Sequence, residues 1–427
     1  MSLIADTATR SYDNGRVLLG GSPRRVLRLT DRGAERARAL LAGDAIRDGV
    51  DAALARRLLD AGLAHPAVPP ATDLSGVEVV VPAYRSRHLA GCLEALAPLK
   101  ATVVDDGSPD PVDGAHVRLP VNRGPAAARN AGLAATTAPI VAFVDSDVAV
   151  GAETLGRLAS MLDADPSLAA VAPRVLPSGS RLDVGPRPGA VRPGARTSYL
   201  PSTVLVVRRA AIEAVGGFDE NLRVGEDVDL VWRLVAAGFW VRYVPELSAT
   251  HQEPPTWIAR LDRSRRYGTA AGPLARRHPS APLSPPLVPT AAVALALTGR
   301  QRLAAALLAA SAVPAARRMR GADVPARDSA LTASTTAVTA TAYAARWLVQ
   351  LWSPVLIGLA RNRSRASRVV LALAVLARVD DLAYGAGVWT GCLRARTARP
   401  LVPGRFELPA RCAGSFRGRR QRSGTRC

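Results

Sequence analysis

Two aspartates separated by one residue follow a short apolar run in the middle of the chain. Asp145 and Asp147 end the sequence FVDSD. On extended backbone, side chains at alternate positions point to one side, and carboxylate oxygens suit Mg²⁺ or Mn²⁺. A metal ion held there would neutralise the charge that builds on a departing diphosphate. A solvated turn is the alternative, but the position directly after a buried-type run favours a metal site.

A second acidic group lies in the sequence GEDVDL, where Asp227 is predicted to open a helix. A carboxylate there could take the proton from an acceptor hydroxyl as a general base. The alternative is that the acid only complements the helix dipole. Farther along, His251 could complete a metal shell with a neutral imidazole nitrogen, although a lone histidine is more often structural.

Two further segments have the residues of a nucleotide site. The sequence VVPAY contains Pro82, which fixes the backbone as the chain leaves a strand, and Tyr84, whose ring could stack on a base. The sequence VVDDGS places Asp105 and Asp106 at the end of the next apolar run. One of these carboxylates could accept a hydrogen bond from a nucleobase N–H, or it could stabilise its own loop as an Asx-turn.

The segment NRGPAAARNAG, residues 122–132, predicts a glycine turn that leads into a helix of small residues. The turn at Gly124 would leave backbone N–H groups free to face an anion. Arg129 is placed to reach the nucleotide, whereas Arg123 fits a solvated surface equally well.

The elements that must position these groups are alternating strands and helices. Apolar runs at 77–81, 101–104 and 140–144 are typical of strands in a parallel sheet, with helical stretches at 89–99 and 126–135 between them. This succession predicts right-handed crossovers and a doubly wound, Rossmann-like α/β sheet. Ligands bind such sheets at the carboxyl ends of the strands, where the polar residues above are found.

The predicted sheet and the polar residues at its edge form a catalytic domain, which we place at residues 74–275. Two other regions flank this domain. Residues 1–70 predict a small winged-helix-like module, with strands at 16–19 and 26–29 around a glycine turn and helices at 34–41 and 51–61. Residues 285–400 predict an Ala/Arg-rich helical region, and residues 401–427 a disordered tail.

The apolar stretches of the helical region are interrupted. Those at 287–297, 303–313, 342–360 and 369–376 all contain or adjoin arginine or proline, so none supplies the ~20 apolar residues of a spanning helix. Two interpretations stay open, a soluble helical domain and attachment to the inner face of the cell membrane. Trp347 and Trp352 would suit a membrane interface.

The composition narrows the class of protein. The 427 residues include 56 basic and 35 acidic ones, a net charge of +21 carried almost wholly by arginine. The high arginine content is explained equally well by the base composition of the genome and by attraction to anions. A nucleic-acid-binding protein is a remote alternative, because the charge is spread along the chain and aromatic residues make up only 4%. Four cysteines without a CxxC pair, and a start without a signal-peptide pattern, indicate a cytoplasmic protein.

Six motifs occur along the chain in the order VVPAY, VVDDGS, NRGPAAARNAG, FVDSD, GGFDE and GEDVDL, and the later histidine follows them. Together they resemble glycosyltransferase family 2, whose members have the GT-A fold and invert the anomeric centre. The resemblance covers roughly residues 77–251. It implies uridine contacts from Asp105 or Asp106 and from Arg129, and a ribose or metal contact from Asp145. It places the metal on Asp147 and His251 and makes Asp227 the base.

The layout of the whole chain resembles the mycofactocin-system glycosyltransferases, which add glucose to a peptide-derived redox cofactor. This implies a UDP-glucose donor, a β linkage, a peptide-derived acceptor and a first module that docks the acceptor or a partner enzyme. One departure is informative, because residues 264–268 read SRRYG where polymer-exporting relatives carry Q-x-x-R-W. The alternative within the family is transfer of another sugar to a cell-wall or lipid glycan.

Overall fold

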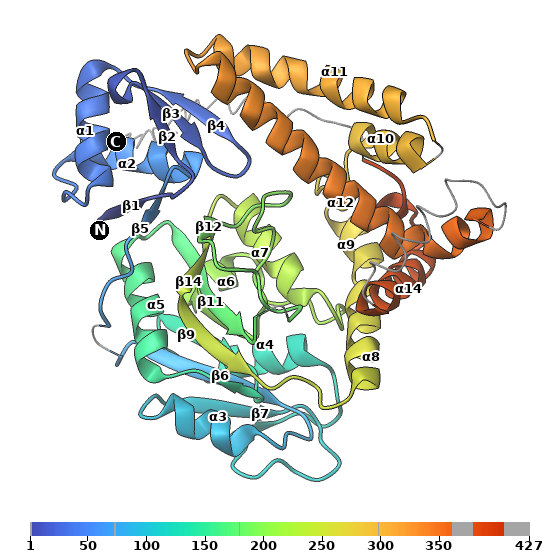
Figure 1. Ribbon diagram of the computed structural model, residues 1–427. Coiled ribbons are helices and arrows are strands. Elements are labelled where there is room, and N and C mark those ends of the chain that lie inside the picture. The colour runs from blue at the N-terminus through green and yellow to red at the C-terminus, as the bar shows by residue number, and fades with distance from the viewer. Residues whose placement is uncertain (1, 72–73, 179, 298, 361–378, 405–427) are drawn as a thin grey trace, which may run out of the picture.

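The computed structural model describes residues 2–71, 74–178, 180–297, 299–360 and 379–404 (Figure 1). It shows three parts in chain order, an N-terminal module, an α/β core and a set of C-terminal helices. The predicted tail, apart from its first residues at 401–404, and the apolar stretch at 369–376 lie outside the described residues.

The N-terminal module is a small sheet covered by two helices. Its strands β2 (Arg10–Tyr12), β3 (Val17–Gly20) and β4 (Arg25–Arg28) form an antiparallel sheet, while β1 (Leu3–Ala5) pairs with β5 (Ala64–Pro66). The Thr30 side chain accepts a hydrogen bond from the N–H of Gly33 and so caps α1 (Asp31–Leu41). Gly62, at φ +67°, ends α2 (Gly49–Ala61). The predicted strands and helices of this module are therefore present.

A nine-stranded mixed sheet forms the core. Its parallel part contains β9 (Ile140–Val144), β6 (Val77–Ala83), β7 (Ala101–Asp105) and β8 (Val117–Arg118), in that spatial order. The predicted Rossmann-like α/β class is confirmed. The other strands are β10 (Val148–Ala149), β11 (Leu168–Leu176), β12 (Gly189–Ala190), β13 (Val204–Arg208) and β14 (Trp240–His251).

Helices cover the core sheet on both faces, which is why its strands read as continuous apolar runs. Val80 and Phe143 pack on one side of the sheet, and Val81 and Val103 pack on the other. At Gly132 a Cβ would lie 2.2 Å from Val80 Cγ1, so the second crossover helix depends on glycine to lie this close. The core helices are α3 (Leu89–Leu96), α4 (Pro125–Ala135), α5 (Ala152–Ala164), α6 (Arg209–Ala214) and α7 (Glu226–Ala236).

Within the described residues, the C-terminal part consists largely of helices. No helix within the described ranges is both long and apolar enough to cross a membrane, and attachment to a membrane surface stays a prediction. The apolar stretch at 303–313 does not end at Pro314, because α11 continues through that proline. The helices are α8 (Trp257–Gly268), α9 (Ala271–Arg277), α10 (Leu287–Leu297), α11 (Gln301–Arg320), α12 (Ala326–Ala360) and α14 (Val379–Arg394).

The N-terminal module contacts both of the other parts, so the three parts form a ring. The module packs Val17 and Leu19 against Met319 beside the α11–α12 turn. On its other side, the Arg56 guanidinium lies 4.0 Å from the centre of the Trp240 ring in the core. Figure 1 shows the module near both the core and the tip of the α11–α12 pair. The space enclosed by this ring contains the candidate site.

Candidate active site

A cavity of about 3430 Å³ is lined by all three parts of the chain. It is several times larger than the ~300–1,000 Å³ typical of a small-molecule site. Most of the predicted site residues meet in it, although they come from separate strands and helices. Those lining it are Pro82, Tyr84, Asp106, Gly124, Arg129, Asp145, Asp147 and Asp227, whereas Asp105 and His251 are not among its lining residues.

The D-x-D aspartates and His251 are brought together by a strand pairing that the sequence does not show. Strand β10 follows the aspartates and runs antiparallel to the end of β14, with Val148 opposite His251. The N–H of Gln252 donates to the carbonyl of Asp147 at 3.0 Å. As a result, His251 Nε2 lies 3.4 Å from an Asp147 carboxylate oxygen.

This pair fits a divalent metal ion. Two ligands at ~2.1 Å from one Mg²⁺, in adjacent octahedral positions, lie about 3 Å apart, close to the separation found here. His251 Nδ1 has no hydrogen-bond partner in the part of the chain described, and it faces Glu253 at 3.5 Å. No cluster of three His, Cys, Asp or Glu side chains suited to a metal occurs among the described residues. The donor's phosphates and water could complete the coordination shell.

Arg129 lines the cavity and is held between two carboxylates. Its side chain is only 3% exposed, and its guanidinium lies between Asp145, at 2.7 Å, and Glu226, at 2.8 Å. Burial opposes the charge, but these two carboxylates raise the pKa of Arg129 above its usual value. Arg129 thus orients two acidic groups of the cavity, and its contact with a nucleotide stays a prediction.

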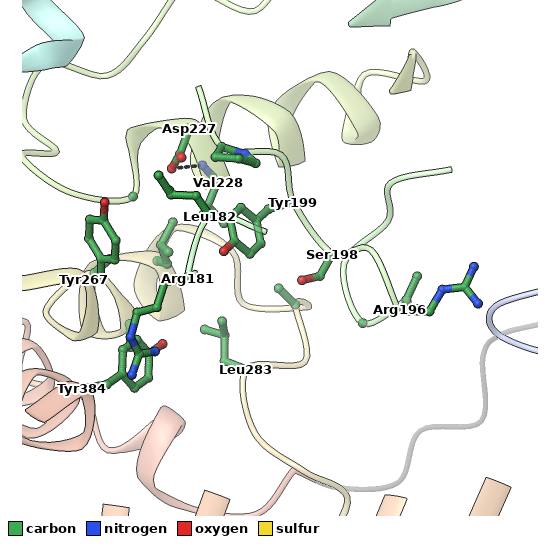
Figure 2. Close-up of a pocket in the computed structure, with 18 of the residues that line it drawn as sticks. Arg181, Leu182, Arg196, Ser198, Tyr199, Asp227, Val228, Tyr267, Leu283 and Tyr384 are labelled. Carbon is green, nitrogen blue, oxygen red and sulfur yellow. Dashed lines mark hydrogen bonds between the residues drawn. The ribbon is translucent and has the colours of Figure 1, made fainter. Parts of the chain in front are cut away.

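Asp227 lies at the start of α7 and lines the cavity (Figure 2). Its charge also acts on Arg129. One carboxylate oxygen accepts from the N–H of Val228 at 2.7 Å, and the other from the N–H of Ser202 at 3.3 Å. Burial raises the pKa of the Asp227 carboxyl, while these hydrogen bonds and Arg129 lower it. A held carboxylate with a raised pKa, open to a cavity, is suited to accept a proton.

The adjacent aspartates at the end of β7 have separate roles. Asp105 is fully buried and accepts from the N–H groups of Ser108 and Val112, which is the loop-stabilising alternative considered above. Asp106 accepts from the N–H groups of Arg123 and Gly124 at 2.8 Å each. Because only Asp106 lines the cavity, we assign the predicted nucleotide contact to Asp106 as a proposal.

Several residues of the cavity were not predicted from the sequence. Glu226 precedes Asp227 in the same motif, and its partner is 97 residues away in the chain. Tyr267 lies in the SRRYG segment, whose only predicted significance was the absence of a Q-x-x-R-W motif. The other unpredicted lining residues shown in Figure 2 have no motif that could have indicated them: Arg181, Leu182, Arg196, Ser198, Tyr199, Leu283 and Tyr384.

Comparison with known proteins shows which family the chain resembles. The family model described as Glycosyl transferase family 2 matches residues 78–204, and that of Glycosyl transferase family group 2 matches residues 187–376. A pre-mycofactocin glycosyltransferase of Mycobacterium tuberculosis is 38% identical over 93% of this chain and 96% of its own length. The succinoglycan biosynthesis protein ExoU of Rhizobium meliloti is 32% identical, over 36% of this chain and 53% of its own.

Solved structures of glycosyltransferases are more distant. A mannosyltransferase from Pyrobaculum calidifontis, solved with GDP-Man and Mn²⁺, is 18% identical, with a TM-score of 0.41 over 77% of this chain and 87% of its own. TarS of S. aureus with UDP-GlcNAc is 20% identical, with a TM-score of 0.37 over 48% of this chain and 67% of its own. On the near full-length identity to the mycobacterial enzyme and the two family matches, the chain belongs to glycosyltransferase family 2.

Proposed function

We propose that this chain is an inverting hexosyltransferase that moves glucose from UDP-glucose to a hydroxyl of a peptide-derived mycofactocin precursor. The single observation that carries the proposal is that Asp147 and Asp227 line one cavity at the carboxyl edge of the core sheet. Asp147 suits binding of the donor's diphosphate through a metal ion, and Asp227 suits proton removal from the acceptor hydroxyl. The likeness to a pre-mycofactocin glycosyltransferase over 93% of the chain supports the acceptor class.

The donor half would be held as follows. Asp106 faces the nucleoside from the end of β7, and Tyr84, 43% exposed, offers a ring on which the base can stack. Asp147 and His251 would hold Mg²⁺ or Mn²⁺, with Asp145 beside them. When bound, this ion would stabilise the negative charge of the departing diphosphate.

The acceptor half would supply the base. Asp227 removes the proton of the acceptor hydroxyl, and the hydroxyl oxygen bonds to the anomeric carbon of the donor. The bond between that carbon and the diphosphate breaks on the opposite face, so UDP leaves and the anomeric configuration inverts. The two N–H groups that bind Asp227 keep its carboxylate in place for this transfer.

The N-terminal module supports an acceptor-docking role, because its β3–β4 turn lines the same cavity. Gly21, Ser22 and Arg24 all face it, and the Ser22 hydroxyl accepts a hydrogen bond from the N–H of Arg196 in the core. Arg24→Ala should therefore raise the acceptor KM and leave the donor Kd unchanged. Arg47→Ala, on an exposed loop away from the cavity, serves as the control. Equal acceptor KM values in the wild type, Arg24→Ala and Arg47→Ala would contradict the docking role.

The transfer itself is tested by product analysis. The full-length protein, a precursor fraction and Mn²⁺ are incubated with UDP-glucose or, in a parallel reaction, UDP-mannose. The proposal predicts a product one hexose heavier with UDP-glucose, with a β anomeric proton by NMR. An α-linked product would contradict inversion, and transfer from UDP-mannose alone would contradict the assigned donor.

A further inference from the structure

Three tyrosines from distant parts of the chain line the cavity beside Asp227. Tyr199 precedes β13, Tyr267 lies near the end of α8, and Tyr384 lies in α14. Figure 2 shows Tyr199 and Tyr267 on two sides of the space below Asp227, with Tyr384 farther from it. All three side chains are partly buried. Burial raises the pKa of Tyr199, and Asp227 and the other two tyrosines raise it further, so the four groups are neighbours.

Among the described residues, none of the three tyrosine hydroxyls forms a hydrogen bond with a protein group. Tyr243, a core residue, shows the contrast, because its hydroxyl donates to the carbonyl of Gly185 at 2.7 Å. Each of the three hydroxyls keeps solvent-accessible surface in the cavity. They can therefore form hydrogen bonds with a bound ligand in place of water.

The aromatic wall is assembled before any ligand arrives. Arg181 Nε donates to the Ser264 hydroxyl at 2.8 Å, and its Nη2 donates to the Asp380 carbonyl at 2.7 Å. The same guanidinium lies 4.9 Å from the centre of the Tyr384 ring. Arg181 thus ties a core loop to α8 and α14, the two helices that carry two of the tyrosines.

The chemistry of the wall selects a ligand class. Aromatic faces pack against flat apolar ring surfaces, and phenol hydroxyls both donate and accept hydrogen bonds at the ring edge. We propose that Tyr199, Tyr267 and Tyr384 form an acceptor subsite that holds a hydroxyl-bearing six-membered ring in front of Asp227. This rests on the proposed function only in taking Asp227 as the base. The ring has two sources, a pyranose or a phenol, and the experiment distinguishes them.

The direct test is ring binding. Saturation-transfer NMR is recorded on the full-length protein with UDP, Mn²⁺ and either methyl β-glucoside or 4-methylphenol. We expect saturation transfer to one of the two probes, which identifies the source of the ring, and a weaker signal in Tyr199→Leu and Tyr267→Leu. No saturation transfer to either probe in the wild type, or an equal signal in the leucine variants, overturns the subsite.

Matched variants separate the subsite from folding and from the donor reaction. Tyr199→Phe and Tyr267→Phe keep the rings and should weaken binding of the chosen probe less than the leucine variants, which should weaken it about three- to tenfold. Tyr343→Leu is the control, because Tyr343 lines the same cavity from α12 but is 48% exposed and neighbours Tyr384 instead of Asp227. Its probe affinity should stay within about twofold of the wild type. A loss in Tyr343→Leu equal to that in Tyr199→Leu also overturns the subsite.

Failure of the proposed function gives a different pattern. If the donor or the reaction has been assigned wrongly, UDP-glucose yields no product, yet the probe still binds and still depends on the tyrosines. If only the subsite is wrong, transfer proceeds and the acceptor KM of Tyr267→Leu equals that of the wild type.

Discussion

The donor side and the acceptor side of the cavity differ in how their polar groups are held. On the donor side, Asp106 accepts three hydrogen bonds from residues 122–124, and Asp145 is paired with Arg129. On the acceptor side, the hydroxyls of Tyr199 and Tyr267 have no partner in the part of the chain that the structure describes. The acidic groups of the donor side are thus held by protein groups, whereas the tyrosine hydroxyls of the acceptor side can still form hydrogen bonds with a ligand. Variants of the two sides should therefore affect different binding steps.

The largest expected effect comes from the residue between the two sides. Asp227→Asn should lower kcat on the order of 10³-fold, because general-base catalysis contributes ~10²–10⁴-fold, while the donor Kd stays unchanged. Steady-state kinetics and calorimetry measure the two quantities. Asp262→Asn, on an exposed face of α8, is the matched control and should behave like the wild type. A wild-type kcat in Asp227→Asn would remove this residue from the mechanism.

A smaller effect, confined to the donor side, is expected for Asp147→Asn. Loss of one negative carboxylate ligand should raise the donor Kd in Mn²⁺ about tenfold or more, equivalent to ~1.4 kcal/mol or more. The acceptor-ring affinity should not change. The same variant titrated in EDTA is its own control, since wild type and variant should then be alike. An unchanged donor Kd in Mn²⁺ would show that Asp147 is not a ligand.

The pH dependence tests the base. Burial raises the pKa of Asp227, and only its deprotonated form accepts a proton. Activity is therefore present above this pKa and is lost as the pH falls through it, by about tenfold per unit. The acid limb of kcat/KM should have its midpoint above ~3.9, the ordinary value of an aspartate. Donor Kd values at the same pH isolate the chemical step, and a limb at or below the ordinary value would contradict the assignment.

The smallest effect is expected from the packing behind the acceptor wall. At Gly387, in α14, a Cβ would lie 1.9 Å from the carbonyl oxygen of Arg265 in α8. Gly387→Ala should therefore push apart the helices that carry Tyr267 and Tyr384, at a cost of about 1–3 kcal/mol in the free energy of unfolding. The acceptor KM should rise severalfold and the donor Kd should not.

The matched control for this substitution is Gly91→Ala in α3. A Cβ there meets nothing within 4 Å, so alanine should be neutral or stabilising by up to ~1 kcal/mol. Thermal unfolding and the two binding assays provide the readouts. A rise in the donor Kd of Gly387→Ala equal to the rise in its acceptor KM would show that the two sides are not independent.

The donor side and the acceptor side also differ in how far they could be predicted from the sequence. Asp106, Asp145 and Asp147 each follow a buried strand within one short motif, so local periodicity was enough to place them at one edge of the sheet. Asp227 was found in the same way, at a helix start. These groups are specified by residues close to them in the chain. The α/β class of the core was predicted from the apolar runs that precede them.

Other features depend on residues far apart in the chain. The pairing of Arg129 with Glu226 joins two helices, and the 3.4 Å approach of His251 to Asp147 requires the β10–β14 pairing. The acceptor wall draws single residues from three separate segments, with Tyr384 185 positions after Tyr199. The family resemblance had already placed one metal ion on Asp147 and His251. No periodicity or motif specifies the Arg129–Glu226 pair or the tyrosine wall, because tertiary packing alone produces them.

The central claim is that the edge of the sheet binds a nucleotide sugar through a metal ion. Calorimetric titration of UDP-glucose into the wild-type protein, first in Mn²⁺ and then in EDTA, tests it most directly. The account predicts saturable binding in Mn²⁺ that is lost in EDTA and restored when Mn²⁺ is added back. Equal affinity in both conditions, or no binding in either, would contradict it.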